Sequence, residues 1–326
     1  MKLATYSNGK RDGELMVVSS DQEHVISASP ICPTLISAME DWLQIGPRLE
    51  ELSHQLNSGV VTGQMFDPHR CMAPLPRAPQ WLDGSAFLNH GRLVSKAFKI
   101  PADESMTSHP LVYQGASDDF RGPYEPIEFP DESLQIDMEG EFGVIVDEIA
   151  MGTSALDAQN AIRLLLLIND WSLRADGPRE MKRGFGFLQA KPSSSFAPLA
   201  ITPDELGDNW NNGRVHLPLH IEVNGQEVGR ANGAEMDFSF GEIIAYAAKT
   251  RRLSAGTVIG SGTVSNADRT AGSSCISEIQ VIELLDKGEI HTPFLSFNDR
   301  VRMQAKDDAG TLPFGELDQI VVQAHI

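Results

Sequence analysis

Two glutamates, Glu139 and Glu141, stand two residues apart in the run IDMEGEFGVIV, residues 136–146. The apolar residues that follow them predict a strand. Alternation along a strand would place both carboxylates on one face, about 7 Å apart. Two like charges this close repel each other, so either the strand meets water at this point or something positive lies between them.

Two aspartates also lie in apolar surroundings, Asp83 in QWLDGSAF and Asp170 in LLLLINDWS. Burying such carboxylates without a compensating charge is costly. A hard divalent cation such as Mg²⁺ or Ca²⁺ is held by oxygen ligands of this kind, usually with water in the remaining positions. The alternative is that each acid faces solvent at the end of a strand or helix. The acids are far apart in the sequence, so their spacing alone does not choose between these alternatives.

The composition limits the class of protein. The chain has 326 residues, of which 41% are hydrophobic, enough for one large or two modest domains. Its net charge of −19 disfavours nucleic acid and anionic membranes as partners, and any anion-binding site must supply its own positive charge. The cysteines have no CxxC spacing, which indicates neither a disulfide framework nor a zinc site. No membrane-spanning run or signal peptide is evident. We therefore expect a cytoplasmic protein.

The order of the expected elements indicates an α+β chain in two parts. Asn8-Gly9 predicts a hairpin turn, and the apolar spacing of residues 31–56 predicts helix, which Pro47 should split in two. Residues 1–75 are therefore expected to form a small N-terminal α+β domain. The proline-rich segment APLPRAPQW then leads into a larger domain, residues 76–326.

The larger part carries mainly β signals. The stretch HLPLHIEVNGQEVGRAN alternates and turns at Asn224-Gly225, and the run RLLLLIND predicts a buried strand that ends near Asp170, although periodicity does not exclude helix. Ser239 and Glu242 form a capping box before a helical stripe. Many short strands with few helices predict a closed or rolled β domain with helices packed outside.

Six segments, in this order, resemble the fumarylacetoacetate hydrolase (FAH) superfamily: WLDGSAFLNH, PLVYQGASDDF, IDMEGEFGVIV, LLINDWSLRAD, GFLQAKPSSSFAP and IGSGTVSN. They extend over roughly residues 78–270. The resemblance implies a small N-terminal domain followed by a mixed β-roll catalytic domain. It also implies a homodimer with a divalent metal in each active site, for which we expect Mg²⁺, with Ca²⁺ and Mn²⁺ as alternatives.

The resemblance further implies roles for single residues. Four carboxylates match metal ligands of the family: Asp83, Glu139, Glu141 and Asp170. A cation would then lie between the two glutamates. Three residues match catalytic positions, in which the histidine activates water, the lysine stabilises an oxyanion and the glutamate orients the histidine: His90, Lys191 and Glu278. Three residues match substrate contacts: Tyr113, Arg174 and Thr263.

Some positions depart from the family pattern. The orienting glutamate of fumarylacetoacetase corresponds to Ile276, and Glu278 would replace it only by sharing a strand face with that position. Gly177 replaces a substrate-binding glutamine, and Phe87 replaces a tyrosine. Three residues are candidates for a second cation near the histidine: Arg92, Lys96 and Lys99. These departures leave the hydrolytic residues in place and leave the substrate open.

Three functions follow as hypotheses. The first is a metal-dependent hydrolase of aromatic catabolism that cleaves the C–C bond of a 1,3-diketo acid, such as fumarylacetoacetate, fumarylpyruvate or another acylpyruvate. The second is a 2-oxo acid decarboxylase or a keto–enol or double-bond isomerase at the same site, because an enolate is common to these reactions. The third is a non-catalytic dimer that binds Ca²⁺ for stability. The presence of Asp83 together with His90 favours the hydrolase over the second hypothesis.

Overall fold

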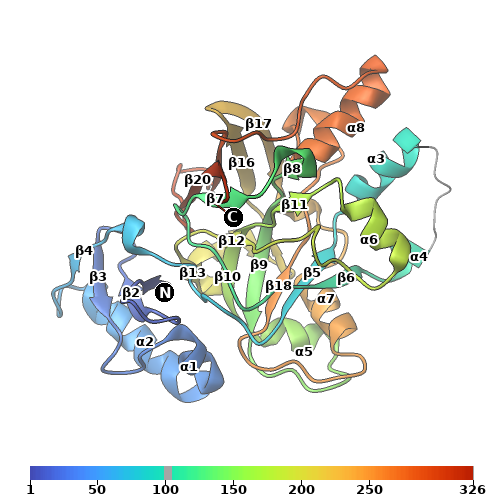
Figure 1. Cartoon of the computed structure of the whole chain (residues 1–326). Coiled ribbons are helices and arrows are strands. Elements are labelled where there is room, and N and C mark those ends of the chain that lie inside the picture. Colours follow the sequence, from blue (N-terminus) through green and yellow to red (C-terminus); the bar gives the residue numbers. More distant parts are fainter. Residues whose placement is uncertain (99–104, 326) are drawn as a thin grey trace.

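A large mixed sheet organises the computed structural model, which describes residues 1–98 and 105–325 (Figure 1). Its strands lie in the order β4 (Gln64–Met65), β3 (His24–Ser27), β2 (Glu14–Val18), β1 (Lys2–Tyr6), β13 (Ala200–Ile201), β10 (Ile162–Asn169), β9 (Gly140–Val146), β18 (Val258–Gly260), β5 (Trp81–Ser85) and β6 (Leu111–Gly115), with β12 (Ser195–Phe196) paired to β10. The strands are antiparallel except for β18 and β5, which run parallel.

A smaller sheet shares a hydrophobic core with the large one. Its order is β17 (Gln226–Asn232), β16 (Pro218–Val223), β19 (Arg300–Ala305), β20 (Glu316–Gln323) and β7 (Ile127–Phe129). Two short pairs complete the strands described: β8 (Ile136–Asp137) with β11 (Ser172–Leu173), and β14 (Trp210–Asn211) with β15 (Arg214–Val215). Within the described chain, neither the large sheet nor the smaller five-stranded sheet closes on its own first strand. The β part is therefore rolled and not closed.

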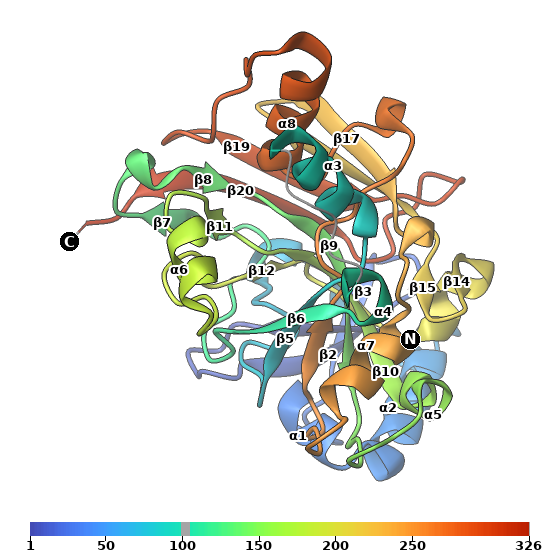
Figure 2. The same cartoon turned by 90° about the vertical axis from the view of Figure 1, so that its right-hand side faces the viewer.

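Helices cover the outside of this β part, as predicted (Figure 2). The α-helices are α1 (Leu35–Glu40), α2 (Trp42–Asn57), α3 (Leu88–Phe98), α4 (Ser105–Ser108), α5 (Ala155–Asn160), α6 (Gly177–Arg183), α7 (Phe240–Ala247) and α8 (Ile276–Lys287). Short 3₁₀ helices are η1 (Pro68–Arg70), η2 (Glu132–Leu134), η3 (Pro203–Asn209), η4 (Gly233–Glu235) and η5 (Arg269–Ala271). Across the described residues, none of the helices combines the length and the apolar character needed to cross a membrane.

The run of leucines in β10 is explained by burial on both faces of the strand. Leu165 and Leu167 lie in the core between the two sheets, whereas Leu164 and Leu166 lie in a second cluster that includes residues of α1 and α2. A strand buried on both sides has a continuous apolar sequence and not an alternating one. Each fully buried leucine stabilises the fold by about 1.5–3 kcal/mol. The predicted buried strand is thus confirmed, and it ends at Asn169, next to Asp170.

Turn and cap signals in the sequence gave correct elements in several places. The Asn224-Gly225 turn joins β16 to β17, and both residues have the positive φ angles (53° and 76°) that such a hairpin turn requires. The capping box of Ser239 and Glu242 begins α7.

The helix break expected at Pro47 was wrong. Pro47 lies inside α2, and the break falls at Asp41, whose φ of −139° is not helical. The residue four positions before the proline, Leu43, is 73% exposed, so water can replace the hydrogen bond that the proline ring removes.

The first 75 residues continue the large sheet. Strand β1 pairs with β13, and Lys2 forms an ion pair with Glu205 of η3 at 2.5 Å. Arg77, in the proline-rich segment, binds Asp12 through two hydrogen bonds of 2.6 and 2.8 Å. The division into domains 1–75 and 76–326 remains a prediction.

Candidate active site

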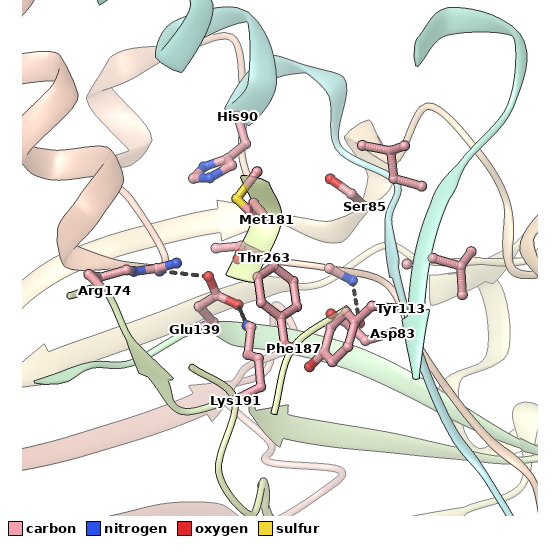
Figure 3. Close-up of a pocket in the computed structure, with 14 residues that line it drawn as sticks. Asp83, Ser85, His90, Tyr113, Glu139, Arg174, Met181, Phe187, Lys191 and Thr263 are labelled. Carbon is pink, nitrogen blue, oxygen red and sulfur yellow. Dashed lines mark hydrogen bonds and ion pairs between the residues drawn. The ribbon is translucent and has the colours of Figure 1, made fainter. Parts of the chain in front are cut away.

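One cavity of about 320 Å³ brings the predicted residues together (Figure 3). Seven of them line it: Asp83, His90, Tyr113, Glu139, Arg174, Lys191 and Thr263. The other three are buried and bonded to, or clustered with, lining residues: Glu141, Asp170 and Glu278.

Three buried carboxylates form an acidic triad: Asp83, Glu141 and Asp170. Adjacent strands bring them together, because β5 and β9 both pair with β18, and β9 pairs with β10, which Asp170 follows directly. Their ligand oxygens lie within 4.8 Å of one another, and the residues are 4%, 0% and 0% exposed. The Oε1 atom of Glu141 is buried and has no hydrogen-bond partner among the residues that the structure describes.

The electrostatics of the triad fit a divalent cation. Burial raises the pKa values of Asp83 and Glu141 well above their ordinary values, and the neighbouring carboxylates raise them further. The protein therefore compensates their charged forms only in part. Three carboxylates with an unpartnered, buried oxygen are a donor set that suits a hard divalent ion.

Gly262 allows the backbone to approach this triad closely. Its N–H faces Asp83 Oδ1 at 3.2 Å and Glu141 Oε2 at 3.1 Å. Its φ of +77° is unfavourable for other residues, and a Cβ atom here would lie 2.3 Å from the Gly84 carbonyl oxygen. The glycine in the GSGT segment is thus required by both backbone conformation and space.

Glu139 has different partners from Glu141. It lies before β9, and its carboxylate accepts hydrogen bonds from Lys191 and from Arg174 Nη2, the latter at 2.6 Å. Burial alone raises the pKa of the Glu139 carboxyl, but Lys191 and Arg174 lower it more, to about 2. Lys191 and Arg174 are therefore two positively charged side chains that face Glu139.

Lys191 connects Glu139 to the acidic triad. Its buried ammonium also donates to Asp170 Oδ2 at 2.6 Å. Burial lowers the pKa of Lys191, but Asp170 and Glu139 outweigh this effect and raise it above the ordinary value. Lys191 is therefore a permanent cation at the floor of the cavity.

His90 and Glu278 form a hydrogen-bonded pair at the cavity wall. His90 lies in the first turn of α3, where the N–H of Leu88 donates to Asp237 at 2.8 Å. The Nδ1 atom of His90 lies 2.7 Å from Glu278 Oε2, and Glu278 is 1% exposed. Because a carboxylate accepts, Nδ1–H donates, and in the neutral imidazole Nε2 then has a lone pair for proton transfer.

The strand expected for Glu278 was wrong, although its carboxylate does reach His90. Residues 276–287 form α8, and Glu278 lies in its first turn. The buried carboxylate of Asp137 accepts from the N–H groups of Ile276 (2.7 Å) and Ser277 (3.0 Å), so the helix begins at this point. A helical first turn, and not a strand face, directs Glu278 toward His90.

The predicted substrate contacts lie around the same space. Tyr113 donates to Asp170 Oδ2 at 2.6 Å, and Thr263 lines the cavity beside Gly262. Arg174 lies on the opposite side of the Glu139–Lys191 pair from Tyr113 (Figure 3). Of the candidates for a second cation, Arg92 is largely exposed and 3.6 Å from Asp237, Lys96 is exposed, and Lys99 is outside the described residues.

Sequence reasoning missed two supporting residues and the apolar residues that line the cavity. Asp137 binds Arg174 Nε at 2.8 Å and stands two residues before Glu139, so the period-two spacing of the acids was a usable signal. Ser194 donates to Asp170 Oδ1 at 2.7 Å; it lies in the family-like segment GFLQAKPSSSFAP, but the resemblance gave it no role. Of the apolar lining residues, Met181 lies before the family-like segment GFLQAKPSSSFAP and Phe187 lies within it, but the resemblance assigned neither of them a role.

Fold and site together define an α+β, β-roll protein with a candidate catalytic cavity built on buried acids. Residues 80–322 match the family model described as fumarylacetoacetate (FAA) hydrolase C-terminal, and residues 1–77 match fumarylacetoacetase N-terminal domain 2. The chain therefore belongs to the fumarylacetoacetate hydrolase family.

Its similarity to characterised relatives is moderate. It is 27% identical over 167 residues to the 2,4-didehydro-3-deoxy-L-rhamnonate hydrolase of Sphingomonas, a match that spans 50% of this chain and 56% of that protein. The chain thus spans only about half the length of this relative. It is 24% identical to the human mitochondrial oxaloacetate tautomerase FAHD2B, over 73% of each chain.

Solved structures share the fold over the whole chain. The maleylpyruvate hydrolase of Sphingobium sp. SYK-6, in complex with manganese(II) and pyruvate, has a TM-score of 0.65 at 17% identity and covers 100% of both chains. The fumarylacetoacetate hydrolase of Exiguobacterium antarcticum has a TM-score of 0.68 at 16% identity, over 99% of this chain and 100% of its own. Relatives named in these comparisons are hydrolases, isomerases and tautomerases.

Proposed function

We propose that the protein is a hydrolase that cleaves the C–C bond of a 2,4-dioxo acid of the acylpyruvate type, and that it acts as a homodimer. In the balanced reaction, R–CO–CH₂–CO–COO⁻ and water give R–COO⁻, pyruvate and a proton. The bond between the acyl carbon and the CH₂ carbon breaks, the hydroxyl adds to the acyl carbon, and a proton adds to the CH₂ carbon. The observation that carries the proposal is the His90–Glu278 pair, which faces the cavity that holds Lys191 and borders the acidic triad.

His90 and Lys191 have complementary roles in this proposal. Nε2 of His90 accepts a proton from water, while Glu278 stabilises the imidazolium that forms. The ammonium of Lys191 supplies a charged donor to the oxyanion that forms when water adds to the acyl carbonyl. His90 can afterwards return its proton to the CH₂ carbon, which completes the balance.

Asp83, Glu141 and Asp170 would hold a divalent cation, for which we propose Mg²⁺, with Mn²⁺ and Ca²⁺ as alternatives. Glu139 borders this site but is already paired with Lys191 and Arg174. When bound, such an ion polarises carbonyl oxygens of the substrate. A manganese-bound neighbour of the same fold supports this assignment.

Loss of enol absorbance tests the proposal on a panel of acetylpyruvate, fumarylpyruvate, fumarylacetoacetate and oxaloacetate, with Mg²⁺ and with chelator. We expect metal-dependent loss, with two carboxylate products identified by chromatography. Lys191→Met should lower kcat by about 10²–10³. Lys182→Met, which changes an exposed lysine of α6, is the matched control. An intact panel with metal-loaded enzyme would contradict the proposal. Light scattering of the same sample tests the dimer.

A second candidate is tautomerisation, isomerisation or decarboxylation of a 2-oxo acid at the same site. It is favoured by the match to an oxaloacetate tautomerase over 73% of each chain. This candidate predicts that the enzyme converts oxaloacetate and leaves the acylpyruvates uncleaved. In D₂O, tautomerisation would exchange the substrate's CH₂ protons without any new carboxylate product. This outcome separates the second candidate from hydrolysis.

A further inference from the structure

Four apolar side chains line the cavity and are named here the apolar wall: Leu111, Val112, Met181 and Phe187. Leu111 is 54% exposed and Met181 is 68% exposed. The Phe187 ring packs edge-on against the Tyr113 ring, with the ring centroids 5.2 Å apart. The aromatic part of the wall is thus held in place by a residue that is itself bonded to the triad. Exposed apolar side chains gathered at one cavity mark a surface that an apolar group can cover.

The cations of the cavity are not part of this wall, although the Lys191 ammonium lies 5.5 Å from the centroid of the Tyr113 ring, against which Phe187 packs. Among the lining residues that the structure describes, Arg174 and Lys191 are the permanent cations. Both already serve carboxylates of the protein, since Arg174 binds Asp137 and Glu139 while Lys191 binds Glu139 and Asp170. Figure 3 shows Arg174 on the side of the Glu139–Lys191 pair away from Tyr113, and Tyr113 follows Leu111 and Val112 in β6.

The apolar wall and the cations can therefore bind different ends of one substrate. A carboxylate next to Arg174 meets a guanidinium. Among the described lining residues, a second carboxylate at the apolar wall would meet apolar side chains and a Lys191 that is already bonded to Glu139 and Asp170. Moving a carboxylate out of water without a partner is strongly unfavourable.

We infer that the apolar wall is the subsite for an uncharged acyl tail. The substrate class is then the 2,4-dioxo monocarboxylates with a short alkyl or aryl tail, and not the dicarboxylates. This inference rests on the proposed function, because it assigns the group R of that reaction. It makes Met181 and Phe187 residues that determine specificity.

Two substrates of equal length test the inference. Butanoylpyruvate and succinylpyruvate differ only in a terminal methyl that is replaced by a carboxylate. We expect kcat/KM for butanoylpyruvate to be at least about tenfold higher. Equal or faster cleavage of succinylpyruvate would overturn the inference and leave the proposed hydrolysis standing. If neither is cleaved, the proposed function fails, and the binding measurement below still decides the inference.

Binding without turnover gives this independent result. The melting temperature of the Mg²⁺-loaded protein is measured with 2-oxohexanoate and with 2-oxohexanedioate, which again differ in one terminal group. A larger increase with the monocarboxylate supports the apolar subsite, and a larger or equal increase with the dicarboxylate contradicts it.

A positive charge placed on the apolar wall should weaken the preference for the monocarboxylate over the dicarboxylate substrate. Met181→Arg is expected to reduce the ratio of butanoylpyruvate to succinylpyruvate kcat/KM by about tenfold, because a charge-assisted hydrogen bond then becomes available. It should also reduce the excess of the 2-oxohexanoate melting shift over the 2-oxohexanedioate melting shift. Leu188→Arg is the matched control, since Leu188 is 82% exposed in the same segment and does not line the cavity. An equal change in both variants would show a general charge effect and overturn the assignment. Circular dichroism confirms that both variants are folded.

Discussion

Glu278 touches the cavity only through His90. Its carboxylate is 1% exposed and lies 2.7 Å from the Nδ1 atom of the histidine. We expect Glu278→Gln to lower kcat by about 10²–10⁴, because an amide cannot stabilise the imidazolium and can favour the wrong tautomer. KM should change little, since Glu278 does not line the cavity. Steady-state kinetics over a range of pH values measure both quantities.

The control for this prediction is Asp286→Asn, on the same helix, which loses only a surface partner, Arg269. A loss of kcat that both variants share would point to destabilised α8. An increase in KM without a loss of kcat would contradict the positioning role of Glu278.

At the scale of single residues, sequence spacing and family resemblance were sufficient to select residues that meet at one cavity. They could not assign the bonding partners of each residue. Glu139 and Glu141 have the same chemistry and period-two spacing, and the cation expected between them stays a prediction. In the structure, Glu139 faces Arg174 and Lys191, which lie 35 and 52 residues further along the chain. Which acid these cations reach depends on tertiary folding, and no local pattern contains that information.

At the scale of elements, the N-terminus of α8 links two parts of the site. Asp137 is fully buried and accepts from two N–H groups of α8 and from Arg174 Nε. It therefore fixes both the helix that carries Glu278 and the guanidinium beside Glu139. Carboxylates at a helix N-terminus satisfy free N–H groups and interact favourably with the helix dipole.

We expect Asp137→Asn to lower the free energy of unfolding by about 1–3 kcal/mol, because one buried acceptor becomes a donor facing donors. It should also raise KM and lower kcat together, since Arg174 and Glu278 both lose a support. Denaturant unfolding and kinetics on one preparation test this. Asp131→Asn, an exposed cap of η2, is the control and should change neither quantity. Loss of stability with unchanged kinetics would make Asp137 a purely structural cap.

Elements with strong local signals were predictable, and those decided by tertiary contacts were not. The hairpin turn at Asn224-Gly225 and the capping box of α7 depend on adjacent residues, and both were correct. The helical state of Glu278 depends on Asp137, which lies 139 residues from Ile276, and it was predicted as a strand.

At the scale of the whole molecule, an ion pair joins the first strand to η3 in the larger part of the chain. Glu205 of η3 is 17% exposed and lies 2.5 Å from Lys2 of β1. Burial raises the pKa of Glu205, but the hydrogen bond from Lys2 contributes to a net decrease below the ordinary value. A carboxyl whose folded-state pKa is lowered stabilises the fold above its unfolded pKa of about 4.3, and this stability is lost as the pH falls through the folded-state value.

Glu205→Gln should therefore lower the free energy of unfolding at pH values near neutrality by about 1–3 kcal/mol. The difference from the wild type should shrink as the pH falls below about 4. Denaturant titrations at several pH values measure it, with the exposed Glu50→Gln as the control. A difference that is constant with pH would show that the ionised form of Glu205 does not contribute.

The acidic triad makes the stability of the whole molecule depend on metal in a particular way. The raised pKa values of Asp83 and Glu141 mean that, without a cation, their ionised forms oppose folding at neutral pH. A cation that binds only the folded state stabilises it by about 2.7 kcal/mol at a hundred times its Kd. We expect chelator to lower the melting temperature of the wild type and Mg²⁺ or Mn²⁺ to restore it. Asp83→Asn should lose this gain, yet melt at the same or a higher temperature than the wild type without metal, because one repelling carboxylate is gone.

A second group, Asp21, Glu23 and His24, also places three ligand atoms within 4.8 Å but is largely exposed, so Glu23→Gln should keep the full metal response. Calorimetry of the three proteins with and without metal decides between the two groups, since a response lost in Glu23→Gln and kept in Asp83→Asn would move the metal site to the surface.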